Sequence, residues 1–479
     1  MQDNGTQNRV RISHTHSVNL TMAFVWKILL LNIFIVSGIS SNVLTGYFWH
    51  ISDLHWDPSY DVGSSSASKC ASSGGRPTPN AGKFGDYSCD SPWTLINSSV
   101  NAMREILPDP DFIVWTGDDT PHVPNEQLGE EPVLRIIGNL THIIKSVFPN
   151  TKVYSAMGNH DYHPKNQMPP EKNNIYEQTA NLWHDWLHTA SKETFKTGGY
   201  YTEKLLNQTG FRVVVLNTNL YYNQNSLTEN IKDPADQFSW AEKVLQDATK
   251  NNEKVYIIGH VPPGMFEKKR DKAWFRKEFN KRYIDLIQKH SAVIQGQFFG
   301  HHHTDSFRMF YSSKGSPINA MFLTPGVTPW ITTLPGVKDG GNNPGIRIFE
   351  YDTKTLLIKD IVTYYLNLTY ANMARARWEK EYRLTEAFHV PDASPASMHR
   401  VMERITSDKC YLQKYFEFNS VGYDLTECHA DCRVDHVCAV REVDFEAYER
   451  CVLKEGGSSA GPALFTLLLS LMLSLLRLN

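Results

Sequence analysis

Short apolar runs recur along the chain from about residue 46 to residue 365, and most of them end in Asp, Asn or His. These runs are GYFWHISDLH, DFIVWTGDD, KVYSAMGNHD, RVVVLNTN, KVYIIGHVPPG and VIQGQFFGHHH. They are rich in Val, Ile, Phe and Tyr without regular polar alternation, which is typical of strands buried on both faces. We therefore expect these runs to form a sheet core, completed by the strands NAMFLTPG, GIRIFEYD and KDIVTYYLNL.

Stretches with helical spacing of apolar residues lie between several of these strands. They are SPWTLINSSVNAMREIL, PVLRIIGNLTHIIKSVF, NNIYEQTANLWHDWLHTA and PADQFSWAEKVLQDATK. The alternation of strands and helices predicts a layered α/β domain over residues 42–369. Ligands of such domains bind at the carboxyl ends of the strands, where the Asp, Asn and His residues stand.

The pattern changes after residue 370. The charged stretch ANMARARWEKEYRLTEAF is expected to be helical, and a Pro-containing linker, residues 390–395, leads to a cysteine-rich helical segment that ends near Cys451. We interpret residues 370–455 as a small helical subdomain that packs on the first domain and is stapled by disulfides.

An apolar stretch near the start of the chain predicts secretion. Lys27 precedes an apolar run, residues 28–36, and small residues follow it up to Ser41. This is the layout of a secretory signal peptide, and the run is too short to span a bilayer comfortably. We interpret the polar residues before Met22 as an upstream extension, and we expect cleavage near Ser40, so that residues 1–41 are absent from the mature protein.

Residues 456–479 have the layout of a glycolipid-anchor signal. Small residues from Gly456 to Ser459 lead into an apolar tail, residues 463–476. We expect a GPI anchor attached within residues 456–459 on the extracellular face of the plasma membrane, with a shed or secreted form besides. The alternative is an ordinary tail-anchoring helix, which the marginal length of the tail and the lack of a cytoplasmic basic cluster disfavour.

Composition narrows the functional classes. The 48 Lys and Arg residues nearly balance the 51 Asp and Glu residues, so nothing indicates a nucleic-acid-binding surface. The seven cysteines gather at residues 70–89 and 410–451, which in a secreted chain predicts disulfides and leaves one thiol over, most simply that of Cys410. Candidate glycan sites in N-x-S/T triplets are Asn97, Asn139, Asn207 and Asn367.

The polar residues at the strand ends are of metal-ligand types. In chain order they are Asp53, His55, Asp118, Asn159, His160, His260, His301 and His303. Carboxylate oxygen and imidazole nitrogen together suit borderline divalent metals. Two metals about 3.5–4 Å apart can clamp the attacking and leaving oxygens of a displacement at phosphorus. The D-x-H and G-D-D motifs carry little information alone and the G-N-H-D and G-H-x-H motifs carry more, and the ordered set of all five predicts a dinuclear site.

The series D-x-H, G-D, G-N-H-D, H and G-H-x-H resembles that of the calcineurin-like metallophosphoesterase superfamily. The resemblance implies a layered β-sandwich flanked by helices, with Asp118 bridging two metals. One metal would be held by Asp53, His55, Asp118 and His303, and the other by Asp118, Asn159, His260 and His301. His302 would point the other way and serve as a neighbour rather than a ligand.

A narrower resemblance is to the acid sphingomyelinase-like phosphodiesterases. It rests on ISDLHWDPSY, SPWTLINSSVNAMREI, SAMGNHDYHPKNQMPP, GHVPPG, the paired Cys70 and Cys89 and the Cys-rich end. Purple acid phosphatases are excluded, because no tyrosine follows Asp118 closely. The anchor signal favours the membrane-bound member of the family. The saposin domain of acid sphingomyelinase is missing here, which leaves cleavage of sphingomyelin open.

The narrower resemblance implies two zinc ions and soluble phosphodiester or nucleotide-type substrates. It also implies an influence on membrane lipids and on innate-immune signalling at the cell surface. The disulfides it implies are Cys70–Cys89, Cys428–Cys432 and Cys438–Cys451.

The resemblance also gives roles to two histidines outside the ligand set. His122 would protonate the leaving alcohol, for which an ordinary solvated loop position is the alternative, and His160 would contact the phosphoryl oxygen. We expect a metal-bridging hydroxide to attack phosphorus in line, in a monomeric enzyme.

Two other functions remain open at this stage. A phosphomonoesterase would differ only in the shape of loops 122–130 and 162–172. A non-catalytic surface protein that binds lipids or receptors would keep the di-zinc core as a structural element. A purely structural site needs neither an open coordination position nor spare imidazoles, so the retained His122 and His160 favour the enzyme.

Overall fold

The computed structural model describes residues 44–337 and 340–457. The expected signal peptide and all of the expected anchor signal after Gly457 lie outside these residues. No helix within the described ranges is long and apolar enough to cross a membrane.

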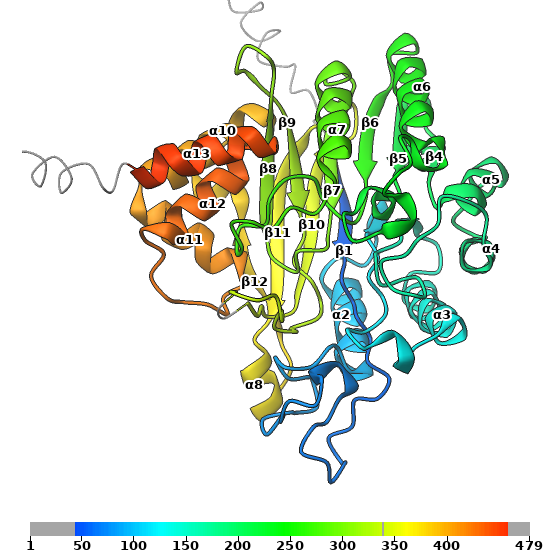
Figure 1. The fold of residues 1–479 in the computed structure, drawn as a ribbon, viewed down its shortest axis with the longest axis vertical. Coiled ribbons are helices and arrows are strands. Elements are labelled where there is room, and N and C mark those ends of the chain that lie inside the picture. The colour runs from blue at the N-terminus through cyan, green and yellow to red at the C-terminus, as the bar shows by residue number, and fades with distance from the viewer. Residues whose placement is uncertain (1–43, 338–339, 458–479) are drawn as a thin grey trace, which may run out of the picture. The chain divides into compact units, whose positions relative to one another are not determined.

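Two six-stranded sheets form the core (Figure 1). The first sheet has the order β12-β11-β10-β1-β2-β3, and its strands β1, β2 and β3 are parallel. The bounds of its strands are β1 Thr45–Ile51, β2 Phe112–Trp115, β3 Lys152–Ser155, β10 Gly345–Asp352, β11 Ile358–Leu366 and β12 Trp378–Arg383.

The second sheet has the order β4-β5-β6-β7-β9-β8, with β5, β6, β7 and β9 parallel. Its bounds are β4 Tyr201–Lys204, β5 Phe211–Val215, β6 Lys254–Ile258, β7 Ile294–Phe299, β8 Ser306–Tyr311 and β9 Pro317–Leu323. The six strands predicted from the Asp/His-ended runs are thereby confirmed, as are the three closing strands.

The two sheets pack face to face through buried aromatic rings. Phe298 of β7 lies edge-on against Phe48 of β1 and Phe349 of β10, with ring centroids 5.3 and 4.9 Å apart. All three rings have no exposed surface. Aromatic contacts of this kind join sheets that are apolar on both faces, so the predicted layered sandwich is confirmed.

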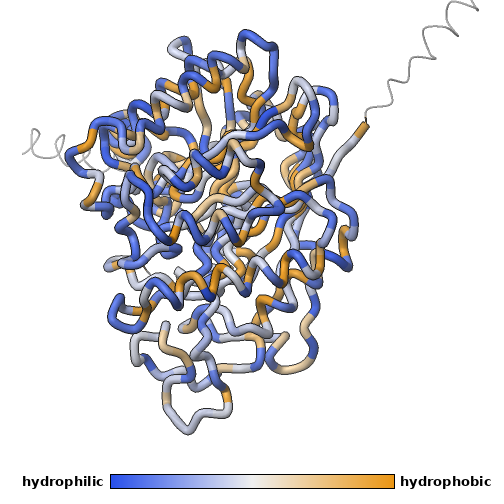
Figure 2. Tube along the Cα trace, turned by 90° about the vertical axis from the view of Figure 1, so that its right-hand side faces the viewer, coloured by the Kyte–Doolittle hydropathy of each residue, from blue (hydrophilic) through white to orange (hydrophobic). Residues whose placement is uncertain are grey.

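Helices on the outside of this sandwich are amphipathic. Their bounds are α2 Trp93–Ile106, α3 Glu130–Val147, α4 Asn174–Leu182, α5 Thr189–Gly198, α6 Gln237–Lys250 and α7 Lys277–Lys289. In α3 the buried residues include Val133, Ile136, Ile137 and Leu140, a single apolar stripe. Figure 2 shows hydrophobic and hydrophilic stretches alternating along such helices. Residues 173–190, expected as one helix, form two, because Trp183 and Trp186 turn inward to pack on Trp115.

Short 3₁₀ segments lie in the connecting loops. They are η1 Ala71–Ser73, η2 Asn125–Gln127, η3 Leu205–Asn207, η4 Thr218–Tyr221, η5 Ser226–Thr228 and η6 Pro234–Asp236.

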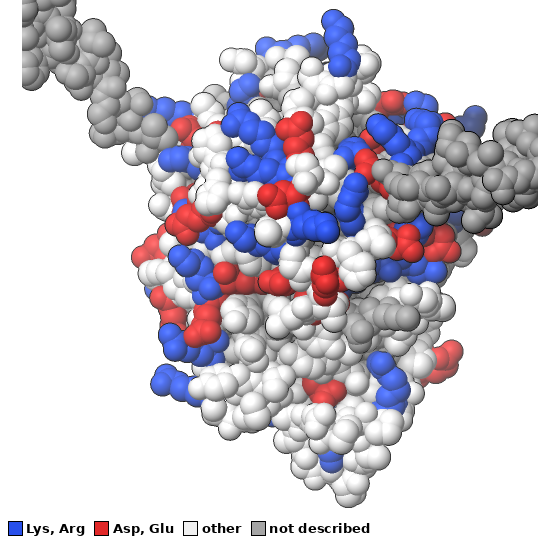
Figure 3. All heavy atoms as spheres, turned by 90° about the vertical axis from the view of Figure 1, so that its left-hand side faces the viewer, with Lys and Arg blue, Asp and Glu red and all other residues white. Residues whose placement is uncertain are grey.

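The C-terminal part is helical and cross-linked, as expected. Its helices are α8 Leu368–Met373, α9 Leu384–Phe388, α10 Pro395–Ser407, α11 Lys409–Asn419, α12 Asp431–Arg441 and α13 Phe445–Gly457. Among them, α10 and α12 pack against β8. Figure 3 shows basic and acidic side chains interspersed on this face of the molecule.

The disulfides of the chain follow the expected pairing. Cys70 bonds to Cys89, Cys428 to Cys432 and Cys438 to Cys451. Cys410 is a free and exposed thiol, as expected.

The prediction of a helix throughout residues 371–388 is wrong. Residues Trp378–Arg383 form β12, the edge strand of the first sheet, which pairs antiparallel with β11. Tyr382 of this strand stacks on Phe418 of α11 with ring centroids 4.1 Å apart. Sheet pairing and this stacking therefore override the helical propensity of a charged stretch.

Candidate metal centre

The predicted ligands meet at the carboxyl ends of five strands. Asp53 and His55 follow β1, Asp118 follows β2, and Asn159 follows β3. From the second sheet, His260 follows β6, and His301 and His303 follow β7. Because the parallel strands of both sheets end at the same edge, residues 250 positions apart are brought into one site, as predicted.

Asp118 lies at the centre of this cluster. Its Oδ2 is 3.1 Å from Nε2 of His260 and 3.4 Å from Nε2 of His55. The carboxylate is 2% exposed. One carboxylate thus faces histidines from both sheets, which is the geometry expected of a residue that bridges two metals.

The other predicted ligands fall on two sides of Asp118. On one side, Asp53 Oδ1 lies 3.5 Å from His303 Nε2 and 4.0 Å from His55 Nε2. On the other side, His260 Nε2 lies 3.1 Å from Asn159 Oδ1 and 3.3 Å from His301 Nδ1. These two groups match the two ligand sets that the superfamily resemblance implies.

The donor chemistry of the cluster fits divalent metals. Nδ1 of His55 lies 2.7 Å from the carbonyl oxygen of Thr120, and Nδ1 of His260 lies 2.7 Å from that of Thr116. A carbonyl only accepts, so each Nδ1 carries a hydrogen and each Nε2 is directed at the centre, where a metal can replace a proton on it.

The centre is rich in atoms that can ligate a metal. Carboxylate oxygens, an amide oxygen and imidazole nitrogens converge there, and Nε2 of His55 is buried without a hydrogen-bond partner. A bound cation would satisfy these buried groups together. Mixed nitrogen and oxygen donors suit zinc and other borderline divalent ions.

The backbone of the site is held in an uncommon conformation. Five predicted ligands have positive φ angles, namely Asp53 (50°), His55 (38°), Asp118 (60°), His301 (72°) and His303 (59°). Left-handed φ angles at non-glycine residues are unfavourable and persist where the surroundings impose them. Asp161 supplies part of this constraint, because its carboxylate accepts the backbone N–H groups of Asp118 and Asp119 at 2.9 and 2.7 Å.

Two motif glycines allow the ligand loops to touch. A Cβ at Gly158 would lie 2.1 Å from Asp118 Oδ1, and a Cβ at Gly300 would lie 2.0 Å from Ser52 Oγ. No side chain fits at either position. The glycines of the G-N-H-D and G-H-x-H motifs are therefore explained by close approach to the neighbouring ligand loops.

The middle histidine of the run 301–303 lies outside the cluster. His302 Nε2 accepts the indole N–H of Trp274 at 2.7 Å, and its Nδ1 lies 3.2 Å from Glu267. Both ring nitrogens are thus occupied by protein groups, in agreement with its predicted role as a neighbour.

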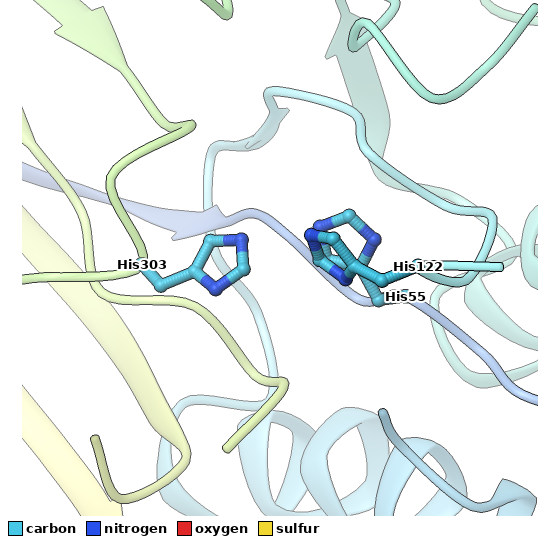
Figure 4. Close-up of side chains that lie close together, drawn as sticks. All are labelled: His55, His122 and His303. Atoms are coloured by element: carbon cyan, nitrogen blue, oxygen red, sulfur yellow. The ribbon is translucent and has the colours of Figure 1, made fainter. Parts of the chain in front are cut away.

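His122 and His160 border a cavity of about 220 Å³ beside the cluster. The His122 ring centroid lies 4.1 Å from that of His55 and 4.5 Å from that of His160. Figure 4 shows His122 beside His55, with His303 opposite, each carried by a different loop. The His122 side chain is only 15% exposed. The alternative of a solvated loop residue is therefore wrong.

Burial and charge set the protonation of these groups. Burial raises the pKa of Asp118, but His260 and His160 outweigh this effect and hold that pKa well below its ordinary value. Burial lowers the pKa of His122 well below its ordinary value, with His55 acting in the same direction, and lowers the pKa of His160 to about 3. A bound phosphate anion acts in the opposite direction, because negative charge favours protonated imidazole.

The sequence interpretation missed several residues of the site. Asp90 contacts His122, Trp330 stacks on it, and Lys165 and Tyr222 line the cavity. None belongs to a motif with metal-ligand spacing. The only available signal was the position of Asp90 directly after Cys89 in an expected disulfide loop.

Comparison with known proteins identifies the family. Residues 46–305 match the model of calcineurin-like phosphoesterases, and residues 316–457 match that of the acid sphingomyelin phosphodiesterase C-terminal region. Acid sphingomyelinase-like phosphodiesterase 3b of Mus musculus is 59% identical over 432 residues, which cover 90% of this chain and 94% of the relative. The chain belongs to the acid sphingomyelinase-like phosphodiesterase family.

More distant relatives of this phosphodiesterase include two with different named substrates. Cyclic GMP-AMP phosphodiesterase SMPDL3A of Homo sapiens is 40% identical over 410 residues, covering 85% of this chain and 90% of the relative. Sphingomyelin phosphodiesterase of Bos taurus is 32% identical over 414 residues, covering 81% of this chain and 63% of the relative. Family and site together make the chain a phosphodiester hydrolase.

Proposed function

We propose that this phosphodiesterase is a cell-surface enzyme that uses two zinc ions to hydrolyse nucleotide-type or lipid-derived phosphodiesters. The observation that carries the proposal is the buried centre around Asp118, where histidine nitrogens from both sheets converge on one carboxylate. A divalent cation satisfies these groups together, and the adjoining cavity leaves room for a substrate.

Two groups of side chains would hold the metals. Asp53, His55, Asp118 and His303 form one group, and Asp118, Asn159, His260 and His301 form the other. When bound, a divalent pair acts as a Lewis acid toward phosphoryl oxygens and lowers the pKa of water.

The chain's own residues supply the proton chemistry of the leaving group. In hydrolysis the oxygen of a water molecule bonds to phosphorus, that water gives up a proton to solvent, and the bond from phosphorus to the leaving alcohol oxygen breaks. His122 gives its Nε2 proton to that oxygen, which leaves as an alcohol, and the imidazole becomes neutral. His160, neutral and 4.5 Å from His122 between ring centroids, donates a hydrogen bond to a phosphoryl oxygen.

The cavity walls favour a substrate with a flat ring and negative charge. Trp330, Trp274 and Tyr222 line the cavity with aromatic rings, and Lys165 lines it as well, with its ammonium group hydrogen-bonded to the carbonyl oxygen of Val123 at 2.9 Å. Aromatic faces stack on nucleobases, and an ammonium group pairs with phosphate. The name of the SMPDL3A relative, a cyclic GMP-AMP phosphodiesterase, supports this class, and that of sphingomyelin phosphodiesterase supports the lipid-derived one.

Surface features support an extracellular location. The three disulfides belong to an oxidising compartment. The four sequon asparagines are all exposed and open to glycan attachment: Asn97, Asn139, Asn207 and Asn367. We extend the proposal to a GPI-anchored protein at the outer leaflet that acts on small substrates there, modulating membrane lipids and innate-immune signalling.

Turnover of a diester and a monoester on the metal-free and zinc-loaded protein tests this function. Zinc should restore cleavage of bis(4-nitrophenyl) phosphate, with 4-nitrophenyl phosphate cleaved far more slowly. Faster cleavage of the monoester would favour a phosphomonoesterase. A folded, zinc-loaded protein that cleaves neither would favour the lipid- or receptor-binding protein with a structural di-zinc core.

A further inference from the structure

A buried carboxylate lies directly behind His122. Oδ1 of Asp90 is 3.0 Å from Nδ1 of His122, and Oδ2 accepts the backbone N–H of the same residue at 2.6 Å. Thr328 donates its hydroxyl to Oδ1 at 3.0 Å. Asp90 has no exposed surface. The backbone amide and the hydroxyl donate, so the carboxylate is surrounded by donors and accepts from each of them.

This contact decides which His122 nitrogen is available for chemistry. A carboxylate oxygen accepts, so Nδ1 carries a hydrogen. The other nitrogen, Nε2, is then the one that can reach the cavity and the leaving oxygen. A carboxylate behind a histidine is a known means of fixing both the tautomer and the ring orientation.

A second constraint on His122 comes from an aromatic ring. Trp330 stacks on the imidazole with ring centroids 3.7 Å apart and an angle of 8° between the planes. Its indole N–H donates to the carbonyl oxygen of Ser72 at 3.2 Å. The stacked indole fixes the orientation of the imidazole plane. The contact with Asp90 fixes the rotation of the imidazole within that plane.

Both constraints start from one disulfide-closed loop. The backbone N–H of Asp90 donates to Ser72 Oγ at 2.9 Å, and Ser72 Oγ donates to Asp57 at 2.6 Å. Ser72 follows Cys70 by two residues, and Asp90 directly follows Cys89, the partner of Cys70. The loop that this disulfide closes therefore carries Asp90 and, through Ser72, also anchors Trp330.

We propose that Asp90 is the positioning residue for His122, and that the loop closed by Cys70–Cys89 holds it in place. Asp90 fixes the imidazole with Nδ1 protonated toward the carboxylate and Nε2 directed at the leaving oxygen. The inference rests on the proposed function of His122 as the acid. It assigns a function to a loop that lies outside the metal-binding motifs.

Leaving-group dependence separates this role from a purely structural one. Two esters of thymidine 5′-phosphate serve as probes, one releasing 4-nitrophenol and the other methanol. Methoxide is a poor leaving group that needs the acid, whereas 4-nitrophenolate leaves readily without it. General acids contribute roughly 100- to 10,000-fold.

Activity is measured on the zinc-loaded holoenzyme. Asp90→Asn should lower kcat for the methyl ester by about 10- to 100-fold and leave kcat for the nitrophenyl ester within a few-fold. The double variant Asp90→Asn/His122→Ala should be no slower than His122→Ala, because Asp90 acts through His122. Ser72→Ala keeps the Asp90 carboxylate and should lower kcat for the methyl ester selectively, by a smaller factor than Asp90→Asn does. This variant tests the proposal if Asp90→Asn does not fold. Asp392→Asn, in the loop before α10, is the matched control and should leave both rates unchanged.

The positioning role of Asp90 and the acid role of His122 are contradicted by different results. Equal losses for both esters in Asp90→Asn, or a double variant much slower than His122→Ala, would overturn the positioning role. A His122→Ala variant that shows no preference between the esters would instead overturn the proposed acid. The two failures are thus distinguishable.

Discussion

The indole N–H of Trp274 donates to Nε2 of His302 at 2.7 Å. Trp274 in turn lies edge-on to His301, with ring centroids 4.3 Å apart. The two neighbouring histidines therefore differ in role: His301 faces the metal cluster, and His302 supports the aromatic wall beside it.

We predict opposite outcomes for the two histidines. His302→Ala should retain two metals per chain and unfold several degrees lower than wild type, because Glu267 and Trp274 lose a buried hydrogen-bond partner. His301→Ala should bind at most one metal. Metal content by mass spectrometry and the thermal midpoint Tm check both variants. Loss of metal in His302→Ala would contradict the assignment.

Gly300→Ala should damage the centre. Its Cβ would lie 2.0 Å from Ser52 Oγ and 2.7 Å from Asp53 Oδ2, so the loop of His301 and His303 must move away from Asp53. We expect at least a 100-fold loss of kcat, since about 1 Å of misplacement costs about that factor. The control is Gly129→Ala, where the nearest atom is 3.7 Å away. A fully active Gly300→Ala would show that the close approach is not needed.

Because the carboxyl group of Glu381 on β12 is buried, we predict that the free energy of unfolding depends on pH. Both of its carboxylate oxygens are buried without a hydrogen-bond partner. Burial raises its pKa well above the ordinary value, although Arg347 acts in the opposite direction. A raised carboxyl pKa means that the folded state keeps its proton longer than the unfolded state. The free energy of unfolding is therefore not reduced by Glu381 below the unfolded-state pKa, where the group is protonated in both states. It falls as the pH rises from the unfolded-state pKa toward the folded-state pKa.

Glu381→Gln removes this loss. Relative to wild type, the variant should gain about 1–3 kcal/mol of unfolding free energy between pH 4.5 and pH 8, the typical penalty of an unsatisfied buried group. Denaturant unfolding at a series of pH values measures the gain. Glu379→Gln, an exposed neighbour on the same strand, is the control and should leave the pH dependence unchanged. A Glu381→Gln curve parallel to that of wild type would refute the prediction.

The sheet core and the metal cluster were predictable because each depends on a local signal. Apolar runs that end in Asp or His specify both a buried strand and the loop that follows it, so Asp53, Asp118 and His260 could be placed from the sequence. The strand β12 could not, because its conformation is decided by pairing with β11 and by stacking of Tyr382 on Phe418.

The surroundings of His122 depend on contacts that no local pattern encodes. Asp90 reaches His122 across 32 positions, and Trp330 reaches it across 208. Both are placed by a loop whose shape follows from the Cys70–Cys89 disulfide and from hydrogen bonds to Ser72. A motif search therefore finds the candidate metal ligands and misses the residues that surround His122.

The most direct test of the two-metal centre compares bound metal and turnover in wild type and Asp118→Asn. Asn replaces the bridging carboxylate with an amide of the same shape and no charge. Wild type should bind two metal equivalents, and its cleavage of bis(4-nitrophenyl) phosphate should rise until both are present. Asp118→Asn should fold, bind at most one equivalent and show no turnover. An Asp118→Asn protein that binds two equivalents and turns over at the wild-type rate would contradict the central claim.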